Sequence, residues 1–253
     1  MMIRKPPVAD PFRVRATWLS WSSHGVSVLR GQRYRGRRDI PERCDTGGVL
    51  SGPPEYEVPI DLGLAEWGPR ERLLAGLAQS IRDRGLAGTQ ITHIVANAHA
   101  SRSTFYKCFA DKDSCFFDLV RLTTNVGLAE VEKAADESAP WDIQVEAAVT
   151  TYFFLLTIDP ALTVAWSRDL AGLGLRGVAV QQEGIERYAT MMRRLSGRSA
   201  MQRAGVPQLS MDLAVMLVGG INTMVVRAIE REESDLGRLA PIAIGVVKAA
   251  LAP

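Results

Sequence analysis

From Arg70 to the C-terminus, apolar residues recur in one segment after another at the 3.6-residue spacing of amphipathic helices. The first segment places Leu73, Leu77 and Ile81 on one face and Arg72 on the other. No alternating apolar and polar pattern, the signature of half-buried strands, competes with it. The sequence therefore predicts an all-α fold. The expected helices cover about residues 70–84, 91–98, 102–109, 111–137, 141–158, 160–171, 178–198, 208–232 and 235–251.

Residues 1–66 lack this period and contain seven prolines, so we expect a largely disordered extension. Its first 43 residues carry ten basic and three acidic groups, including the cluster Arg30–Arg38. Two alternatives to a plain solvated tail are a basic arm that reaches DNA and a translation start further downstream. Residues 70–112 hold seven basic and three acidic groups, whereas residues 113–253 hold thirteen and seventeen. A basic segment before an acidic one is typical of a nucleic-acid-binding module joined to a part that does not touch phosphate.

Three cysteines in a chain of 253 residues do not form a disulfide framework, which favours a reducing compartment. The sequence shows no uninterrupted apolar run of about 18 residues and no secretory leader. We therefore expect a cytoplasmic protein without a membrane partner.

Two short helices joined by a tight turn at residues 99–101 predict a helix-turn-helix, whose second helix would enter the major groove. Ser101 is suited to cap that second helix. Phe105 and Phe109 would anchor it from below, while its other positions are polar, small or basic, which is typical of a surface that binds phosphate and bases.

The segment "GLAGTQITHIVANAHASRSTFYKCFADKDSCF" (85–116) resembles the N-terminal domain of tetracycline-repressor-like (TetR) regulators. The matching residues are Gly85, Thr89, Ile94, Ala98, Ser101, Thr104, Phe105, Tyr106, Phe109, Lys112 and Asp113. Two positions depart from the family pattern: His99 replaces the usual turn glycine, and Val95 replaces a small alanine. Histidine is among the residues enriched at positive φ, so the turn tolerates it.

This resemblance implies the residues that contact DNA. They are Thr92, Ser101, Arg102, Ser103, Thr104, Tyr106, Lys107 and Lys112. Arg102 would read guanine through its two-pronged guanidinium, and Tyr106, Lys107 and Lys112 would bind phosphates.

One such unit reads few base pairs, so we expect a homodimer on palindromic double-stranded DNA. The resemblance implies that the last two helices form the interface. The candidate residues on the penultimate helix are Leu213, Met216, Leu217, Gly220, Ile221, Met224 and Val225.

The middle helices are where the family binds a small-molecule effector. The candidate lining residues are Trp141, Tyr152, Phe153, Phe154, Trp166, Tyr188, Met191 and Met192, with Arg168, Asp169, Gln181 and Gln182 as polar contacts.

Three other signals do not support a site. Gly172, Gly174 and Gly177 spell G-x-G-x-x-G, but a helix precedes them and no acidic residue follows at the required distance. The three histidines share no ligand-like spacing, so we predict no metal and no cofactor. No grouping of nucleophile, base and acid supports an enzyme.

The sequence thus predicts three parts: an extension (1–66), a helix-turn-helix domain (67–115), and an effector-binding and dimerisation domain (116–253). The predicted function is a ligand-responsive repressor that a small molecule releases from DNA. Two alternatives are a DNA-binding protein without effector that uses the basic arm, and an enzyme that uses the helical cavity.

Overall fold

The computed structural model describes residues 15–16, 56–57, 68–233 and 235–253. In this part of the chain the structure is helical, apart from a short antiparallel pair of strands, β1 (Arg15–Ala16) and β2 (Tyr56–Glu57). The all-α prediction is confirmed. The predicted disordered extension and the basic arm at Arg30–Arg38 lie outside the described residues.

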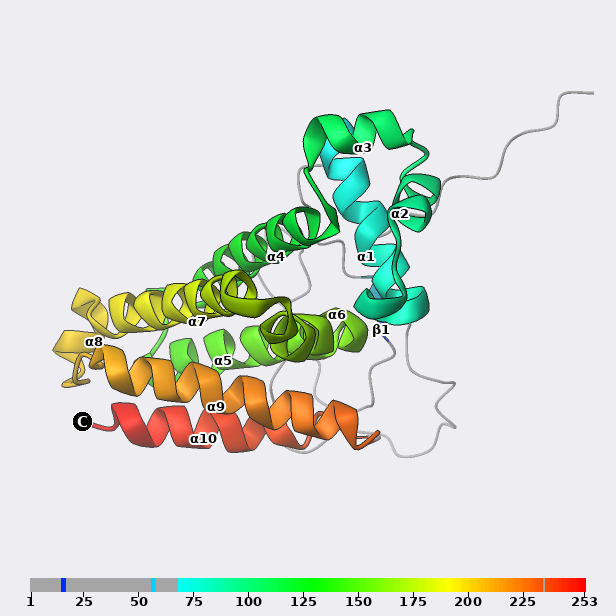
Figure 1. Cartoon of the computed structure of the whole chain (residues 1–253). Helices are drawn as coiled ribbons and strands as arrows, with labels where there is room; N and C mark the ends of the chain where they lie inside the picture. Colours follow the sequence, from blue (N-terminus) through cyan, green and yellow to red (C-terminus); the bar gives the residue numbers. More distant parts are fainter. Residues whose placement is uncertain (1–14, 17–55, 58–67, 234) are drawn as a thin grey trace, which may run out of the picture.

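Three helices form a small unit at one end of the molecule (Figure 1): α1 (Pro69–Gly88), α2 (Ile91–Asn97) and α3 (Arg102–Cys108). Their order and the tight turn between α2 and α3 are those of a helix-turn-helix. Gly76 allows α2 to approach α1, because a Cβ there would lie 2.5 Å from the carbonyl oxygen of Ile94. Gly85 interrupts α1 with a φ of 70°, and the following Leu86 is buried, which agrees with the predicted break in the helix.

The turn between α2 and α3 has the predicted conformation. His99 adopts a φ of 49°, a left-handed value that glycine adopts most easily. Ser101 then caps α3, because its hydroxyl accepts a hydrogen bond from the Thr104 amide at 3.0 Å. The departure of His99 from the family pattern is therefore accommodated.

The remaining helices form a bundle that α4 joins to the three-helix unit (Figure 1). They are α4 (Lys112–Ala134), α5 (Trp141–Thr157), α6 (Pro160–Val164), α7 (Gly174–Ser196), α8 (Ser199–Arg203), α9 (Met211–Glu230) and α10 (Leu239–Leu251), with two irregular turns, η2 (Ala165–Asp169) and η3 (Ala171–Leu173). Helices α9 and α10 lie side by side on the face remote from α1–α3.

The structure differs from the predicted helices mainly between residues 160 and 205. The helix expected at 160–171 begins at Pro160, capped by Asp159, but then changes to the π-helical η2 and the 3₁₀ turn η3. Helix α7 begins at Gly174 and includes Gly177, where a Cβ would overlap the Leu170 carbonyl oxygen. Helix α8 has no counterpart in the prediction. The last helix begins at Leu239, so Pro241 lies in its first turn.

The apolar core consists of two clusters. The first contains the buried faces of α1–α3 together with Phe116 and Leu119 of α4, and it extends into the bundle through Leu162, Leu170 and Val180. The second fills the space among α5, α7, α9 and α10. The predicted boundary between residues 115 and 116 therefore lies within α4 and within a shared core.

By length and mean hydropathy, α9 is the one unbroken helix in the described residues that meets the criteria for a membrane span, and α5 with α6–η2 meets them as a bent pair. Asp212, Asn222 and Arg227 interrupt this helix, so it is not an uninterrupted apolar run of the kind that the sequence lacks. A third of its apolar window is buried inside the protein.

Candidate DNA interface and effector cavity

Helix α3 turns one face into the protein and the other to solvent. Phe105 is completely buried and Phe109 nearly so, and the two rings pack 5.7 Å apart. The opposite face is exposed and hydrophilic: Ser101, Arg102, Ser103, Tyr106 and Lys107. Thr104 is half-buried, and its hydroxyl contacts that of Ser101 at 2.9 Å. The sequence-predicted contact residues of α3 therefore lie on one outward surface.

No acidic residue lies close to α3 in the sequence. Residues 84–110 contain no Asp or Glu. Among the described residues, none forms an ion pair with Arg102 or Lys107. Thr92, on α2, is half-buried and contacts the Gln90 side chain at 3.4 Å. The side chains of Arg102 and Lys107 are therefore available to bind phosphates or bases.

Lys112 occupies a different environment. Its ammonium group is partly buried and donates hydrogen bonds to the carbonyl oxygens of Leu86 at 2.9 Å and Thr89 at 3.0 Å. These bonds join the start of α4 to the last turn of α1 and to Thr89, the residue that follows it. An ammonium group has three N–H bonds, so one is left for a phosphate.

Sequence reasoning missed Arg70, which holds the far end of α3. Its guanidinium donates to the Cys108 carbonyl oxygen at 3.0 Å, pairs with Asp118 of α4, and lies 4.5 Å from the centre of the Phe109 ring. Arg70 thus connects α1, α3 and α4. The signal in the sequence is weak, because an arginine in the first turn of a helix usually faces solvent.

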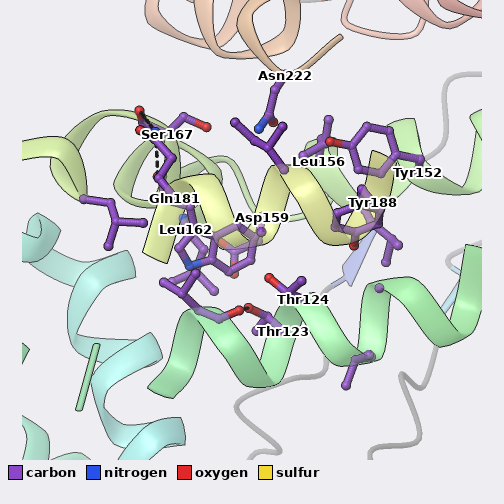
Figure 2. Close-up of a pocket in the computed structure, with 18 of the residues that line it drawn as sticks. Thr123, Thr124, Tyr152, Leu156, Asp159, Leu162, Ser167, Gln181, Tyr188 and Asn222 are labelled. Carbon is purple, nitrogen blue, oxygen red and sulfur yellow. Dashed lines mark hydrogen bonds between the residues drawn. The ribbon is translucent and has the colours of Figure 1, made fainter. Parts of the chain in front are cut away.

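The bundle encloses a cavity of about 140 Å³. It lies between α4, α5, α6, α7 and α9, and Figure 2 shows side chains of these helices around it. Its wall is mostly apolar: Val120, Leu122, Val126, Leu155, Leu156, Ile158, Leu162, Leu170, Val180, Ile185 and Val218. Two glycines, Gly127 of α4 and Gly184 of α7, also line it. Such a site suits an apolar ligand.

Three of the eight predicted pocket residues line this cavity: Tyr152, Trp166 and Tyr188. Gln181 also lines it, as predicted for a polar contact, and donates to the Ser167 carbonyl oxygen at 2.7 Å (Figure 2). The prediction needs correction for the other five, which lie outside the cavity wall: Trp141, Phe153, Phe154, Met191 and Met192. Phe153 and Met191 are buried in the second core cluster, where Trp141 and Met192 also pack.

Two tyrosines of the cavity wall lie close together and are buried. The Tyr152 and Tyr188 rings are 4.8 Å apart, and burial raises the pKa of both hydroxyl groups. Both stay protonated at physiological pH and can act as hydrogen-bond donors. Burial likewise raises the pKa of the Cys115 thiol, which keeps this cysteine in its unreactive form.

One ion pair connects the cavity wall to the helix-turn-helix. Arg82 of α1 donates from Nε to Oδ2 of Asp159 at 2.6 Å, and both residues line the cavity. The other oxygen of Asp159 caps α6 by accepting from the Leu162 amide at 3.1 Å. Only 20% and 10% of the two side chains are exposed, so solvent screens the pair weakly. The Asp159 carboxylate thus pairs with a side chain of α1 and caps the N-terminus of α6.

The predicted interface residues on α9 divide into two groups. Leu217, Ile221 and Val225 are buried inside the subunit, which corrects their assignment to an outer surface. Met216 is 62% exposed, Gly220 is exposed, and Leu213 and Met224 are half-buried. Ile242 and Val246 of α10 are about half exposed. The exposed apolar face of the two helices therefore consists of Met216, Gly220, Ile242 and Val246.

A three-helix unit whose third helix presents a polar face above an aromatic base is a helix-turn-helix DNA-binding domain. Residues 73–119 match the family described as bacterial regulatory proteins, tetR family. The matched segment runs from α1 to the first turns of α4. The helix-turn-helix segment of the chain therefore matches the tetR family, and the resemblance drawn from its sequence is confirmed.

Solved structures with the same fold include fatty acid regulators. FadR from Bacillus subtilis in complex with stearoyl-CoA is 18% identical, with a TM-score of 0.61 over 71% of this chain and 97% of that one. FadR from Bacillus halodurans is 17% identical, with a TM-score of 0.62 over 72% and 95%. Reduced NemR from E. coli is 16% identical, with a TM-score of 0.60 over 73% and 98%. No curated protein sequence matches the chain.

The described residues contain no cluster of three or more His, Cys, Asp or Glu side chains arranged to hold a metal ion.

Proposed function

We propose that this protein is a cytoplasmic transcriptional repressor, not an enzyme, which binds a palindromic operator as a homodimer and leaves it when a small molecule enters the bundle. The observation that carries the proposal is the exposed hydrophilic face of α3 above the buried Phe105, in a domain that matches the tetR family. The cavity below this domain supports the role of an effector, as does the stearoyl-CoA bound to a regulator of similar fold.

We assign base recognition to Arg102, because a guanidinium can address O6 and N7 of guanine together. Tyr106 and Lys107 hold the phosphates on either side, and the third N–H bond of Lys112 holds another. Ser101, Ser103, Thr104 and Thr92 supply shorter hydroxyl contacts. The exposure of the α3 residues supports this division.

A second copy of the chain covers the exposed apolar face of α9 and α10 in the proposed dimer. One observation supports this occupant: Gly220 is exposed and nothing lies within 4 Å of its Cβ position, so a partner helix can come close. A two-fold dimer is also the arrangement expected to bind half-sites about 34 Å apart.

The Arg82–Asp159 pair and the shared core couple the cavity to DNA binding. A ligand that moves α6 displaces Asp159, and with it the end of α1 that Arg82 holds. Because α1 packs on α2 and α3, a small rotation there changes the separation of the two reading helices. The effector then favours the state with the wrong spacing.

The test is to select bound duplexes from random DNA with the full-length protein and then to compare variants on the selected site. Arg102→Ala should lower discrimination at one base pair by about 1–3 kcal/mol. Lys107→Ala should weaken binding to all sequences and reduce the slope of log K against log salt by about 0.9. If no palindrome emerges, or if both variants bind like the parent, the assignment is wrong.

A screen for compounds that release the selected DNA tests the effector role. Release by a compound whose binding is lost in a cavity variant supports it. A protein that no compound releases would favour the alternative without effector, and conversion of a bound compound to a product would favour the enzyme.

A further inference from the structure

Two buried polar atoms in the cavity wall have no hydrogen-bond partner within the described structure. They are the indole Nε1 of Trp166 and the amide Oδ1 of Asn222. Most buried polar groups are paired, since an unpaired donor or acceptor loses its bonds to water without replacement. One unpaired donor and one unpaired acceptor lie in the wall of the same cavity. This points to a ligand that forms a hydrogen bond with each of them.

Helical elements of the bundle determine where Trp166 and Asn222 lie. Trp166 lies in the π-helical turn η2, where the Leu170 amide bonds to the Ala165 carbonyl oxygen at 3.0 Å. Such turns change the direction of a side chain and occur often at functional sites. Asn222 extends from α9 toward the bundle interior and lines the cavity (Figure 2).

The charged groups of the wall, and two of its other polar groups, already have partners. Arg82 and Asp159 neutralise each other at 2.6 Å. The Gln181 amide donates to the Ser167 carbonyl oxygen, and the Thr123 hydroxyl donates to the Leu119 carbonyl oxygen at 2.9 Å. The wall therefore presents no unpaired formal charge, and burying a charged ligand there would be unfavourable.

The volume sets the size of the ligand. A cavity of about 140 Å³ is close to the engineered cavity of about 150 Å³ that binds benzene in another protein. A single six-membered ring with one polar substituent fits this space. A long acyl chain exceeds this volume.

We propose that the cavity binds a small uncharged ring compound that carries both a hydrogen-bond acceptor, for the indole N–H of Trp166, and a hydrogen-bond donor, for the amide oxygen of Asn222. This inference rests on the proposed function, because it names the chemical class of the effector for the same cavity. It adds that two named atoms select the ligand.

The experiment compares four probes of similar size on the full-length protein by isothermal titration calorimetry. Phenol donates and accepts hydrogen bonds, toluene does neither, benzoate is an anion and benzylammonium is a cation. We expect phenol to bind about tenfold more tightly than toluene, because it satisfies an unpaired buried group. Both ions should bind more weakly than toluene.

Two variants test the assigned atoms. Trp166→Phe and Asn222→Leu should each reduce the preference for phenol over toluene to about threefold or less. The matched controls are Trp141→Phe, a tryptophan outside the cavity, and Gln144→Leu, which removes another buried amide whose oxygen is unpaired. Neither control should change the preference, even if it changes stability.

Each outcome has a distinct meaning. Equal binding of phenol and toluene to the parent would overturn the proposal while leaving the effector cavity in place. So would tighter binding of benzoate or benzylammonium, or a control that abolishes the preference. If none of the four probes binds, the small-ligand proposal is wrong, whether or not stearoyl-CoA binds. Operator selection, which needs no ligand, then decides separately whether the DNA-binding function stands.

Discussion

At the scale of single residues, Gly76 determines how closely α2 packs on α1. A methyl group there would lie 2.5 Å from the Ile94 carbonyl oxygen and 2.9 Å from the Ala98 amide nitrogen, and backbone atoms cannot move aside as a side chain can. Gly76→Ala should therefore lower the free energy of unfolding by about 2 kcal/mol and weaken DNA binding. Urea denaturation measures the first effect.

Gly88 is the matched control, because a Cβ there would meet only the Arg84 side chain, at 3.4 Å. Gly88→Ala should leave stability unchanged or raise it by less than about 1 kcal/mol. Equal losses in both variants would contradict the close packing of α2.

Asp159 has two roles that two substitutions separate. Asp159→Asn keeps an oxygen to cap α6 but removes the charge that pairs with Arg82, whereas Asp159→Ala removes both. The alanine variant should be less stable than the asparagine variant by about 1 kcal/mol, the usual value of a cap. Asparagine should keep ligand binding while reducing the release of DNA by ligand.

A double-mutant cycle with Arg82→Gln measures the coupling between the two side chains. We expect a coupling free energy of about 1 kcal/mol. This is the upper end of the range for exposed ion pairs, and we choose it because the Arg82–Asp159 pair is mostly buried. A coupling near zero, with normal release of DNA, would exclude this route of communication.

At the scale of elements, the contact between α4 and α7 depends on Gly127. A Cβ at this position would overlap the Tyr188 hydroxyl oxygen, so Gly127→Ala should push the ring into the cavity and lower stability by about 1–3 kcal/mol. Gly184→Ala is the control on α7, where the nearest atom would be the Thr124 hydroxyl oxygen at 3.8 Å. Thermal unfolding should show a loss for the first variant only.

The helix-turn-helix was predictable in detail because its signals are local. The cap at Ser101, the left-handed His99 and the alternation of Phe105 with polar neighbours each depend on residues close in sequence. The segment from Pro160 to Gly177 was not predictable in the same way. It contains a π-helical turn and an early start of α7, with Gly177 packed closely on Leu170, and no local sequence pattern shows this packing.

At the scale of the whole molecule, the apolar face of α9 and α10 should decide the oligomeric state. Met216→Glu would place a charge at the centre of the proposed interface and should convert the dimer to a monomer in analytical ultracentrifugation. Leu175→Glu, which changes a side chain on α7 that is 89% exposed, should leave the dimer intact. A parent protein that sediments as a monomer at micromolar concentration would contradict the dimer.

The bundle shows why the pocket was harder to predict than the DNA interface. Aromatic residues and methionines at helical spacing point to an interior, but the sequence does not say whether that interior is filled or hollow. Phe153 and Met191 fill it, whereas Tyr152 and Trp166 border the cavity. The polar lining residue Asn222 was missed because one asparagine in an apolar helix is not distinctive.

The core shared by α1–α4, Leu162 and Val180 has a calorimetric consequence. The three-helix unit α1–α3 should not unfold on its own, since its apolar cluster also includes Leu162 of α6 and Val180 of α7. Heating should produce one cooperative endotherm for α1–α3 and the adjoining part of the bundle. A compound bound in the cavity should therefore also raise the melting temperature of α1–α3.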